Sequence, residues 1–262
     1  MAIITANFFP LSLGFDTRIE VLMPQDPRHY QDSYAPIEKI VYLLHGSGGD
    51  SAYWMRETRV AVYAAQHRYM VVMPEVQRSC YCDMKHGSAY FTYITQELPK
   101  IVEQLFNFKH IREKTFIAGL SMGGYGAMKC GLGRPDFYGA CASFAGAVDI
   151  AGDILSKGES DGIYTTLQSI WGTDLIIPPE DDIFALAKET AKLPREKKPR
   201  VLLTCGDKDF LLKGNRKFNA FMQTLPIDYE YKEWSGSHDW LFWEQCLPIM
   251  FDFFNQTQEG IQ

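Results

Sequence analysis

The chain has 262 residues, of which 46% are hydrophobic and 22% charged, the composition of a globular protein that buries a sizeable core. Its 26 Lys and Arg are outnumbered by 32 Asp and Glu, giving a net charge of −6, and no long basic run could follow a phosphate backbone. Composition therefore excludes a fibrous or disordered chain and argues against nucleic acid as a partner.

Signals for export, membrane insertion and metal binding are missing from the sequence. Residues 1–7 lack the basic segment, long apolar stretch and cleavage site of an export signal. No apolar run approaches membrane-spanning length. The six cysteines are scattered, and the spacing of Cys80 and Cys82 does not suit paired zinc ligands. We expect a cytoplasmic protein with reduced thiols, no membrane partner and no metal.

The first half of the chain alternates short apolar runs with stretches of helical composition. Alternating or continuous apolar residues predict strands at 16–23, 39–44, 69–73 and 114–118. Helices are predicted at 52–66, at 92–106 and from the glycine turn after residue 118 to about 132. The Pro-containing stretch from Pro24 to Pro36 is predicted to be a loop.

In the second half, the alternation is interrupted once and then resumes. A strand is predicted at 138–144, followed by an insertion at about 149–198 that is rich in Gly, Ser, Asp and Pro and that we interpret as a lid. Strands are then predicted at 200–205 and 228–234, and helices at 211–224 and 239–254. The whole pattern predicts one α/β domain over 1–262, with a mainly parallel central sheet, helices on both faces and a cap-like insertion.

Ser121 lies in the pattern G-x-S-x-G, formed by Gly119-Leu120-Ser121-Met122-Gly123, between a predicted strand and a predicted helix. This pattern places a serine on a tight, strained turn at the carboxyl edge of a sheet, with the glycines leaving room for the crossing backbone. The five residues alone occur by chance in many proteins. The preceding strand is what favours Ser121 as a nucleophile.

A serine nucleophile needs a base and an acid that orients the base. In this kind of fold the chain order is serine, acid, histidine, and five of the six histidines precede Ser121, which leaves His238. The acid should follow the predicted strand at 200–205, where Asp207 and Asp209 both qualify. Sequence physics alone does not separate these two carboxylates.

Two backbone N–H groups are expected to stabilise the oxyanion of such a reaction. The first is that of Met122, directly after the nucleophile, and the second comes from a loop after the first buried strand. We predict the N–H of Ser47, in His45-Gly46-Ser47-Gly48-Gly49, as the second donor. His45 itself is expected to brace this loop by hydrogen bonding.

These motifs resemble the α/β-hydrolase esterases of the esterase D and S-formylglutathione hydrolase type, and most closely the bacterial tributyrin esterase or acetyl esterase branch. The resemblance rests on Leu43-Leu44-His45-Gly46 with Trp54, on the serine turn, and on Cys205-Gly206 with Asp209-Phe210-Leu211. It also rests on Gly236-Ser237-His238-Asp239-Trp240, and it extends to segments between Tyr81 and Pro99. It covers most of the chain.

The resemblance implies the α/β-hydrolase fold and favours Asp209 as the acid, because the family's aspartate directly precedes a Phe-Leu pair. It implies no cofactor, no metal, and a small-molecule ester substrate, an acylated sugar among the options. Trp54, Tyr125 and Trp240 are expected to line the substrate pocket with the insertion. The expected function is a serine carboxylesterase for short acyl esters, from acetyl to butyryl.

Other functions are compatible with the same motifs. An S-formylglutathione thioesterase, a feruloyl or acetyl-sugar esterase and an acyltransferase would all keep the serine, acid and histidine. A binding protein that has lost activity on this fold is a remote alternative, because fold does not imply function. Such a protein would be expected to have a broken triad or a blocked serine turn, and here serine, acid and histidine are all present in order.

Overall fold

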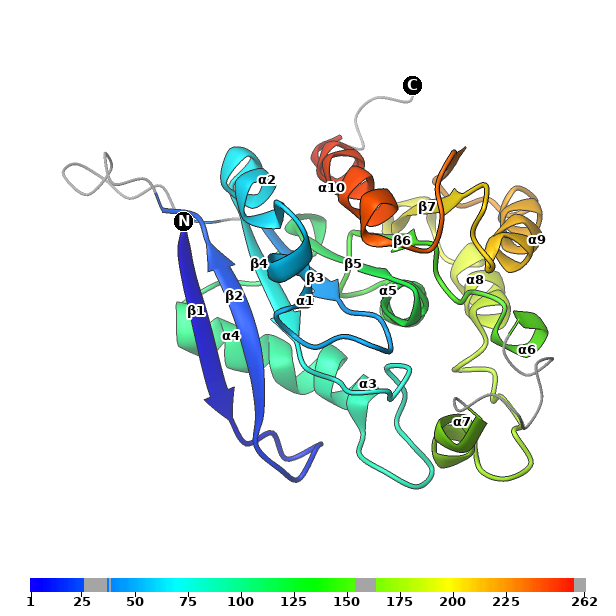
Figure 1. Cartoon of the computed structure of the whole chain (residues 1–262), viewed down its shortest axis with the longest axis horizontal. Helices are drawn as coiled ribbons and strands as arrows, with labels where there is room; N and C mark the ends of the chain where they lie inside the picture. Colours follow the sequence, from blue (N-terminus) through cyan, green and yellow to red (C-terminus); the bar gives the residue numbers. More distant parts are fainter. Residues whose placement is uncertain (26–36, 38, 154–163, 257–262) are drawn as a thin grey trace.

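An eight-stranded sheet forms the centre of the computed structural model, which describes residues 1–25, 37, 39–153 and 164–256. The spatial order is β1-β2-β4-β3-β5-β6-β7-β8 (Figure 1). The strands are β1 (Ala2–Phe8), β2 (Thr17–Met23), β3 (Lys39–Leu44), β4 (Tyr69–Pro74), β5 (Thr115–Leu120), β6 (Ala140–Phe144), β7 (Arg200–Gly206) and β8 (Tyr229–Trp234). β1 and β2 are antiparallel to their neighbours, and all pairs from β4 to β8 are parallel.

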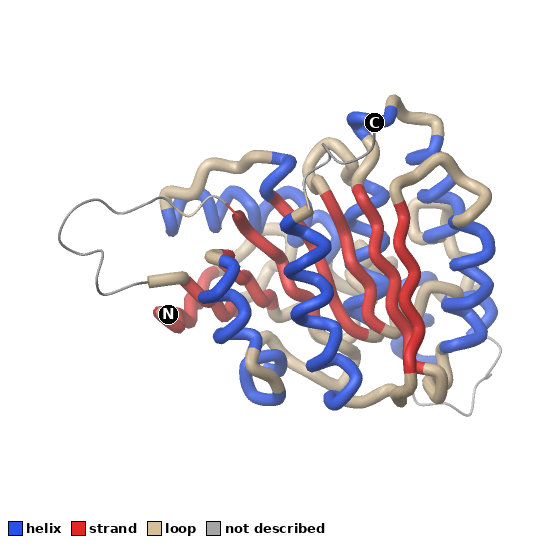
Figure 2. Tube along the Cα trace, turned by 90° about the horizontal axis from the view of Figure 1, so that it is seen from above, coloured by secondary structure: helices blue, strands red, loops and turns tan. Residues whose placement is uncertain are grey.

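Helices cover both faces of this sheet (Figure 2). The helices are α1 (Tyr53–Glu57), α2 (Val60–His67), α3 (Tyr90–Thr92), α4 (Leu98–Phe106), α5 (Met122–Gly133), α6 (Ile150–Asp153), α7 (Tyr164–Trp171), α8 (Ile183–Ala191), α9 (Leu212–Met222) and α10 (Trp240–Asn255). A π-helical turn, Tyr93–Glu97, joins α3 to α4, and short 3-10 turns span Arg112–Lys114 and Arg195–Lys197.

Two hydrophobic clusters fill the space between the sheet and these helices. Along β3, Val41 and Leu43 belong to the cluster that includes α1, α2 and α10, whereas Ile40, Tyr42 and Leu44 belong to the cluster that includes α4, α5, α8 and α9. Successive side chains of a strand point to opposite faces. The continuous apolar run at 39–44 therefore exists because both faces of this central strand are buried.

The parallel strands bring their carboxyl ends to one edge of the sheet. The loops after β3, β5, β7 and β8 start there, and these are the loops that carry the residues expected to form a site. In open α/β sheets this edge is where ligands bind. The strand order thus gathers residues that are far apart in the sequence.

The predicted fold class is confirmed, with local differences in three elements. The helix predicted at 52–66 is two helices, separated at Thr58, whose backbone is extended. The helix predicted at 92–106 contains the π turn just before Pro99, which has no N–H to give to the carbonyl of Thr95. Arg134 donates to that carbonyl instead, at 3.1 Å. β1 was not predicted, because this edge strand alternates only between half-buried and exposed residues.

The region predicted as an insertion, 149–198, contains α6, α7 and α8. Ile183, Ala187, Leu167 and Ile170 pack into the same cluster as α5. Residues 154–163 lie outside the described residues, as do residues 26–36 of the loop predicted from Pro24 to Pro36, His29 among them. That the insertion acts as a lid on a single domain stays a prediction. No helix of the described chain is long and apolar enough to cross a membrane.

Candidate active site

Ser121 stands on the sharp turn between β5 and α5 in a conformation that side chains rarely adopt. Its φ is +54° and its ψ is −118°, and holding a residue there costs about 1–3 kcal/mol. Gly119 and Gly123 make the turn sterically feasible. A Cβ at Gly119 would collide with the backbone of Gly123, and one at Gly123 with the backbone of Leu44. The glycine spacing read from the sequence therefore has a direct steric cause.

A continuous line of hydrogen bonds joins Ser121, His238 and Asp209. His238 Nε2 lies 2.9 Å from Ser121 Oγ, and His238 Nδ1 lies 2.7 Å from Asp209 Oδ2. The carboxylate only accepts, so Nδ1 carries a hydrogen and Nε2 is free to accept the serine proton. The side chain of Asp209 has no solvent exposure and that of His238 has 16%. The base is thus oriented by a buried charge while it still faces the serine.

The loop after β7 separates the two candidate acids. Asp209 also accepts the N–H of Leu211 through Oδ1, at 2.8 Å, which fixes its carboxylate beside His238. Asp207 instead accepts the N–H of Gly236, at 3.1 Å, and has no hydrogen bond to His238. The structure therefore brings Asp209, and not Asp207, to the histidine.

The N–H groups of Ser47 and Met122 belong to two peptides whose carbonyls accept hydrogen bonds from other backbone N–H groups. The carbonyl of Ser121, in the peptide that carries the Met122 N–H, accepts from Tyr125 N at 3.1 Å and Ala147 N at 3.2 Å. The carbonyl of Gly46, in the peptide that carries the Ser47 N–H, accepts from Gly49 N at 3.0 Å. Neither Ser47 N–H nor Met122 N–H has an acceptor within the described residues.

Gly46 places the two peptides close together. A Cβ built on Gly46 would lie 3.5 Å from Ser121 Cβ and would clash with the side chain of Leu120. Any larger residue here would have to displace the Leu120 methyl, so glycine lets the loop after β3 lie against the serine without strain. Since Met122 also opens α5, the positive end of the helix dipole points toward the same region. Both features favour a negative charge beside Ser121.

Potential metal ligands do not gather in the described part of the chain, where no group of three His, Cys, Asp or Glu is arranged to hold an ion. All six cysteines are buried free thiols. Burial raises the pKa of Cys82 to about 12. The thiols are therefore protonated and are poor nucleophiles near neutral pH.

A family model and one curated relative match almost the whole chain. The model of the Esterase family matches residues 12–254. An acetyl esterase of Caldicellulosiruptor saccharolyticus is 31% identical over 269 residues, which cover 99% of this chain and all of the relative. The chain belongs to the Esterase family.

Solved structures of serine hydrolases have the same fold as this esterase. FphF of Staphylococcus aureus, a fluorophosphonate-binding serine hydrolase, is 28% identical with a TM-score of 0.86, over 98% of this chain and 99% of its own. FrmB of the same organism, an S-formylglutathione hydrolase, is 28% identical with a TM-score of 0.83, over 97% and 98%. The family, the acetyl esterase relative and these neighbours identify the chain as a serine esterase with the α/β-hydrolase fold.

The three aromatic residues expected in the substrate pocket of this esterase have different environments. Trp54 has no solvent exposure, and its Nε1 donates to the carbonyl of Leu44 at 3.0 Å. It supports the loop after β3 from the core, and its contact with substrate stays a prediction. Tyr125 is 1% exposed but lines a cavity of about 440 Å³, and Trp240 is half-buried against Trp54. Their contact with substrate stays a prediction.

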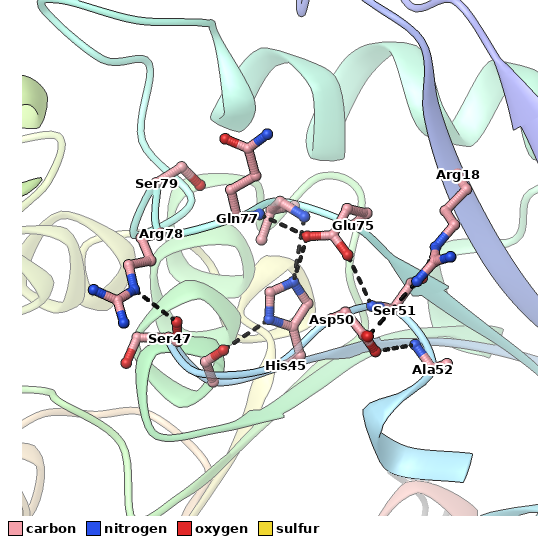
Figure 3. Close-up of polar contacts among 12 residues, drawn as sticks. Arg18, His45, Ser47, Asp50, Ser51, Ala52, Glu75, Gln77, Arg78 and Ser79 are labelled. Carbon is pink, nitrogen blue, oxygen red and sulfur yellow. Dashed lines mark hydrogen bonds and ion pairs between the residues drawn. The ribbon is translucent and has the colours of Figure 1, made fainter. Parts of the chain in front are cut away.

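Several residues near the site were not predicted as site residues, although Phe210 and Tyr81 lie in segments that carry the family resemblance. The ring of Phe210 is 61% exposed, and its centroid lies 4.4 Å from that of His238. Glu75 and Arg78, in the loop after β4, contact the loop that contains His45 (Figure 3). Tyr81, further along the same loop, donates to the carbonyl of His45 at 2.8 Å. The available signal was position, since Glu75 directly follows a buried strand that ends at the same edge as β3 and β5.

Proposed function

We propose that this serine esterase hydrolyses carboxylic esters of short acyl chains, from acetyl to butyryl, through Ser121, His238 and Asp209. The observation that supports this most directly is the unbroken hydrogen-bond line from Ser121 Oγ to Asp209. The strained backbone at Ser121 supports it as well, because strain is kept where function requires it. The acetyl esterase relative supports the short acyl chain.

The acylation step follows from the positions of these atoms. Ser121 Oγ attacks the carbonyl carbon of the ester while His238 Nε2 takes the serine proton, and the carbonyl π electrons move onto oxygen. The N–H groups of Ser47 and Met122 donate to this oxyanion, and the carboxylate of Asp209 stabilises the imidazolium. The tetrahedral intermediate then expels the alkoxide, which takes the proton from His238 and leaves as the alcohol.

Deacylation repeats these roles with water. His238 removes a proton from a water molecule as its oxygen attacks the acyl carbon bound to Ser121. The second oxyanion accepts hydrogen bonds from the same two N–H groups. When this tetrahedral intermediate breaks down, the bond between the acyl carbon and Ser121 Oγ is cleaved. The proton returns from His238 to the serine oxygen, so the enzyme is regenerated and the carboxylic acid is released.

A thioester is the second candidate substrate. The observation that favours it is the likeness over nearly the full length to FrmB, named as an S-formylglutathione hydrolase. The same serine, histidine and oxyanion donors would act on a thioester. Comparing kcat/KM for S-formylglutathione with that for p-nitrophenyl acetate distinguishes the two, and an excess of roughly tenfold or more for the thioester would move it to first place.

Location and partners are proposed with the substrate. We place the enzyme in the cytoplasm, a proposal supported by its six buried free thiols, which a reducing compartment preserves. The proposed partner is a small-molecule ester, with acylated sugars included, rather than nucleic acid or a membrane. The net charge of −6 supports the exclusion of nucleic acid.

Hydrolysis of p-nitrophenyl esters from acetyl to decanoyl, by the wild type and Ser121→Ala, tests the function. We expect activity to peak at the short chains and kcat to fall by roughly four to six orders of magnitude in the variant, with the same melting temperature. Thr224→Ala, which removes an exposed hydroxyl after α9, is the control and should retain activity. An organophosphate should add one group, at Ser121, by mass spectrometry. Wild-type activity retained by Ser121→Ala would contradict the proposal.

A further inference from the structure

Four consecutive peptide carbonyls, from the last residue of β3 into the loop that follows, each accept a hydrogen bond from a side chain. The donors are Trp54 Nε1 to Leu44 O at 3.0 Å, Tyr81 OH to His45 O at 2.8 Å, His45 Nδ1 to Gly46 O at 2.8 Å and Arg78 Nε to Ser47 O at 3.2 Å. Side-chain donors to every successive carbonyl of a loop are unusual, because carbonyls at a surface can bond to water instead. The orientation of these peptides is therefore set by the protein.

The third of these contacts controls the proposed oxyanion donor. In a trans peptide the C=O and the N–H point in opposite directions, so the direction of Gly46 O sets the direction of Ser47 N–H. Gly46 O accepts from the buried ring of His45, which is 1% exposed, as well as from Gly49 N–H at 3.0 Å. The Ser47 N–H consequently points away from that ring, out of the core.

The ring of His45 has a defined tautomer. Val76 N–H donates to Nε2 at 3.2 Å, so Nε2 is an acceptor without a hydrogen and Nδ1 carries the hydrogen given to Gly46 O. The side chain of Glu75 fixes the segment that contains the Val76 N–H. It accepts Gln77 N–H at 2.9 Å and Ser51 N–H at 3.1 Å (Figure 3). Glu75 thereby connects residues 75–77, which bond to His45 Nε2, to the loop after β3, which contains His45.

The segment that supports His45 is itself strained. Gln77, Cys80 and Tyr81 all have positive φ, at 53°, 50° and 56°. Each such conformation costs about 1–3 kcal/mol and persists only where surrounding contacts enforce it. The ring of Tyr81 packs where a Cβ at Gly126 would be, on α5 itself. This segment thus links the nucleophile helix to the loop that contains His45 and Ser47.

We propose that His45 is a positioning residue, whose Nδ1–H holds Gly46 O and so aims the Ser47 N–H at the oxyanion formed on the substrate. This inference rests on the proposed function, in which Ser47 N–H is one of the two donors. His45 transfers no proton and does not contact substrate. Its contribution to the rate comes from fixing one peptide before the reaction starts, so that no reorganisation is needed in the transition state.

Two substitutions separate this role from a merely structural one. In His45→Asn the side-chain amide nitrogen takes the place of Nδ1 and can still donate to Gly46 O, whereas the contact at Nε2 is lost. In His45→Gln the amide reaches the position of Nε2, and the donor at Nδ1 is lost. Each variant removes one buried hydrogen bond, so similar losses of stability are expected from both.

The rates of the two variants should nevertheless differ. Removing a donor from an oxyanion hole lowers kcat by roughly 10²–10³. In His45→Gln the Ser47 N–H is misdirected but still present, so we expect a kcat roughly tenfold or more below that of His45→Asn. The Michaelis constant should change little in either, since the interaction forms in the transition state. The inhibition constant of a short alkyl trifluoromethyl ketone, which forms an oxyanion with the serine, should rise by the same factor as kcat falls.

The control pair is His110→Asn and His110→Gln. His110 also donates to a backbone carbonyl, that of Phe137 at 2.9 Å, but it precedes the amino end of β5, at the opposite edge of the sheet. This pair should show equal kcat values. Equal kcat and equal ketone affinity for His45→Asn and His45→Gln would overturn the proposal. Retained activity in Ser121→Ala would instead overturn the proposed function.

A measurement on the wild type covers the case in which the His45 variants do not fold. In protein labelled with ¹⁵N-histidine, long-range ¹H–¹⁵N spectra distinguish the two neutral tautomers. Variants of the other five histidines assign the signal of His45. We expect the Nδ1–H form near neutral pH, and an Nε2–H form for His45 would overturn the proposal, because His45 would then give no hydrogen to Gly46 O.

Discussion

At the scale of single residues, the environments of Asp207 and Asp209 show how two neighbouring carboxylates acquire different roles. Asp209 accepts a backbone N–H at one oxygen and faces His238 with the other. Asp207 lies on the other side of the turn, where it accepts the N–H of Gly236 in the loop before His238. The first holds the imidazole, and the second holds only the backbone of the loop that carries it.

Replacing each carboxylate by its amide tests this division. Asp209→Asn should lower kcat by roughly 10⁴ with an unchanged fold, because an amide at this position no longer stabilises the imidazolium and favours the wrong tautomer. Asp207→Asn should stay within about threefold of the wild type, since its remaining carbonyl oxygen can still accept the N–H of Gly236. Steady-state kinetics with p-nitrophenyl acetate measure both. Equal losses in two folded variants would refute the assignment of Asp209.

At the scale of elements, a buried ion pair connects α5 to the segment before α8. Lys129, in α5, is 2% exposed, and its Nζ lies 2.5 Å from Asp181 Oδ1. The other oxygen of Asp181 accepts Trp171 Nε1 at 2.7 Å, and its carbonyl accepts Tyr125 OH at 2.6 Å. Burial by itself would lower the pKa of Lys129, but the charge of Asp181 and its hydrogen bond raise it above its usual value. The lysine is therefore charged at neutral pH and forms an ion pair with Asp181.

Breaking this pair should weaken the attachment of the region at 164–191. Lys129→Met leaves the carboxylate of Asp181 buried without its cation, and we expect a loss of roughly 3–5 kcal/mol in the free energy of unfolding. Urea denaturation followed by circular dichroism measures it. The exposed pair of Lys192 and Glu189 is the control, and Lys192→Met should cost no more than about 1 kcal/mol. Losses of equal size in the two variants would show that burial does not matter here.

At the scale of the whole molecule, the order of the strands in the sheet brings together the residues of the candidate site. Ser121 and His238 are 117 residues apart in the sequence and in hydrogen-bond contact in space. Four loops that begin after β3, β5, β7 and β8 supply the Ser47 N–H, Ser121, Asp209 and His238. Because parallel strands of one sheet carry all four loops, the site depends on the fold of the whole sheet.

Global stability should depend on pH partly through His45. Burial lowers its pKa below the usual 6.5, although the Gly46 carbonyl, Glu75 and Asp50 act to raise it. Below pH 6.5 the unfolded chain takes up a proton that the folded chain does not, so this contribution to stability is complete above pH 6.5 and decreases as the pH falls. Urea unfolding at about pH 7.5 and about pH 5.5 should show a larger loss for the wild type than for His45→Asn. An equal loss would contradict a depressed pKa.

The sequence by itself determined the features that depend on neighbouring residues. The parallel α/β sheet followed from continuous apolar runs at 39–44 and 69–73, because strands covered on both faces have no polar side. The serine turn followed from glycines that leave room for crossing backbone at Gly119 and Gly123. The histidine followed from chain order, since five of the six histidines precede Ser121.

Only the tertiary structure decided what depends on residues distant in the sequence. The residues alone left Asp207 and Asp209 open, and their orientation is set by contacts across the turn with the loop of His238. Trp54 was expected at the pocket, and its side chain is buried beneath the loop after β3. The side chains that hold the carbonyls of residues 44–47 come from α1 and from the loops after β3 and β4. Such contacts arise from how β4, β3 and β5 lie side by side, which no local pattern encodes.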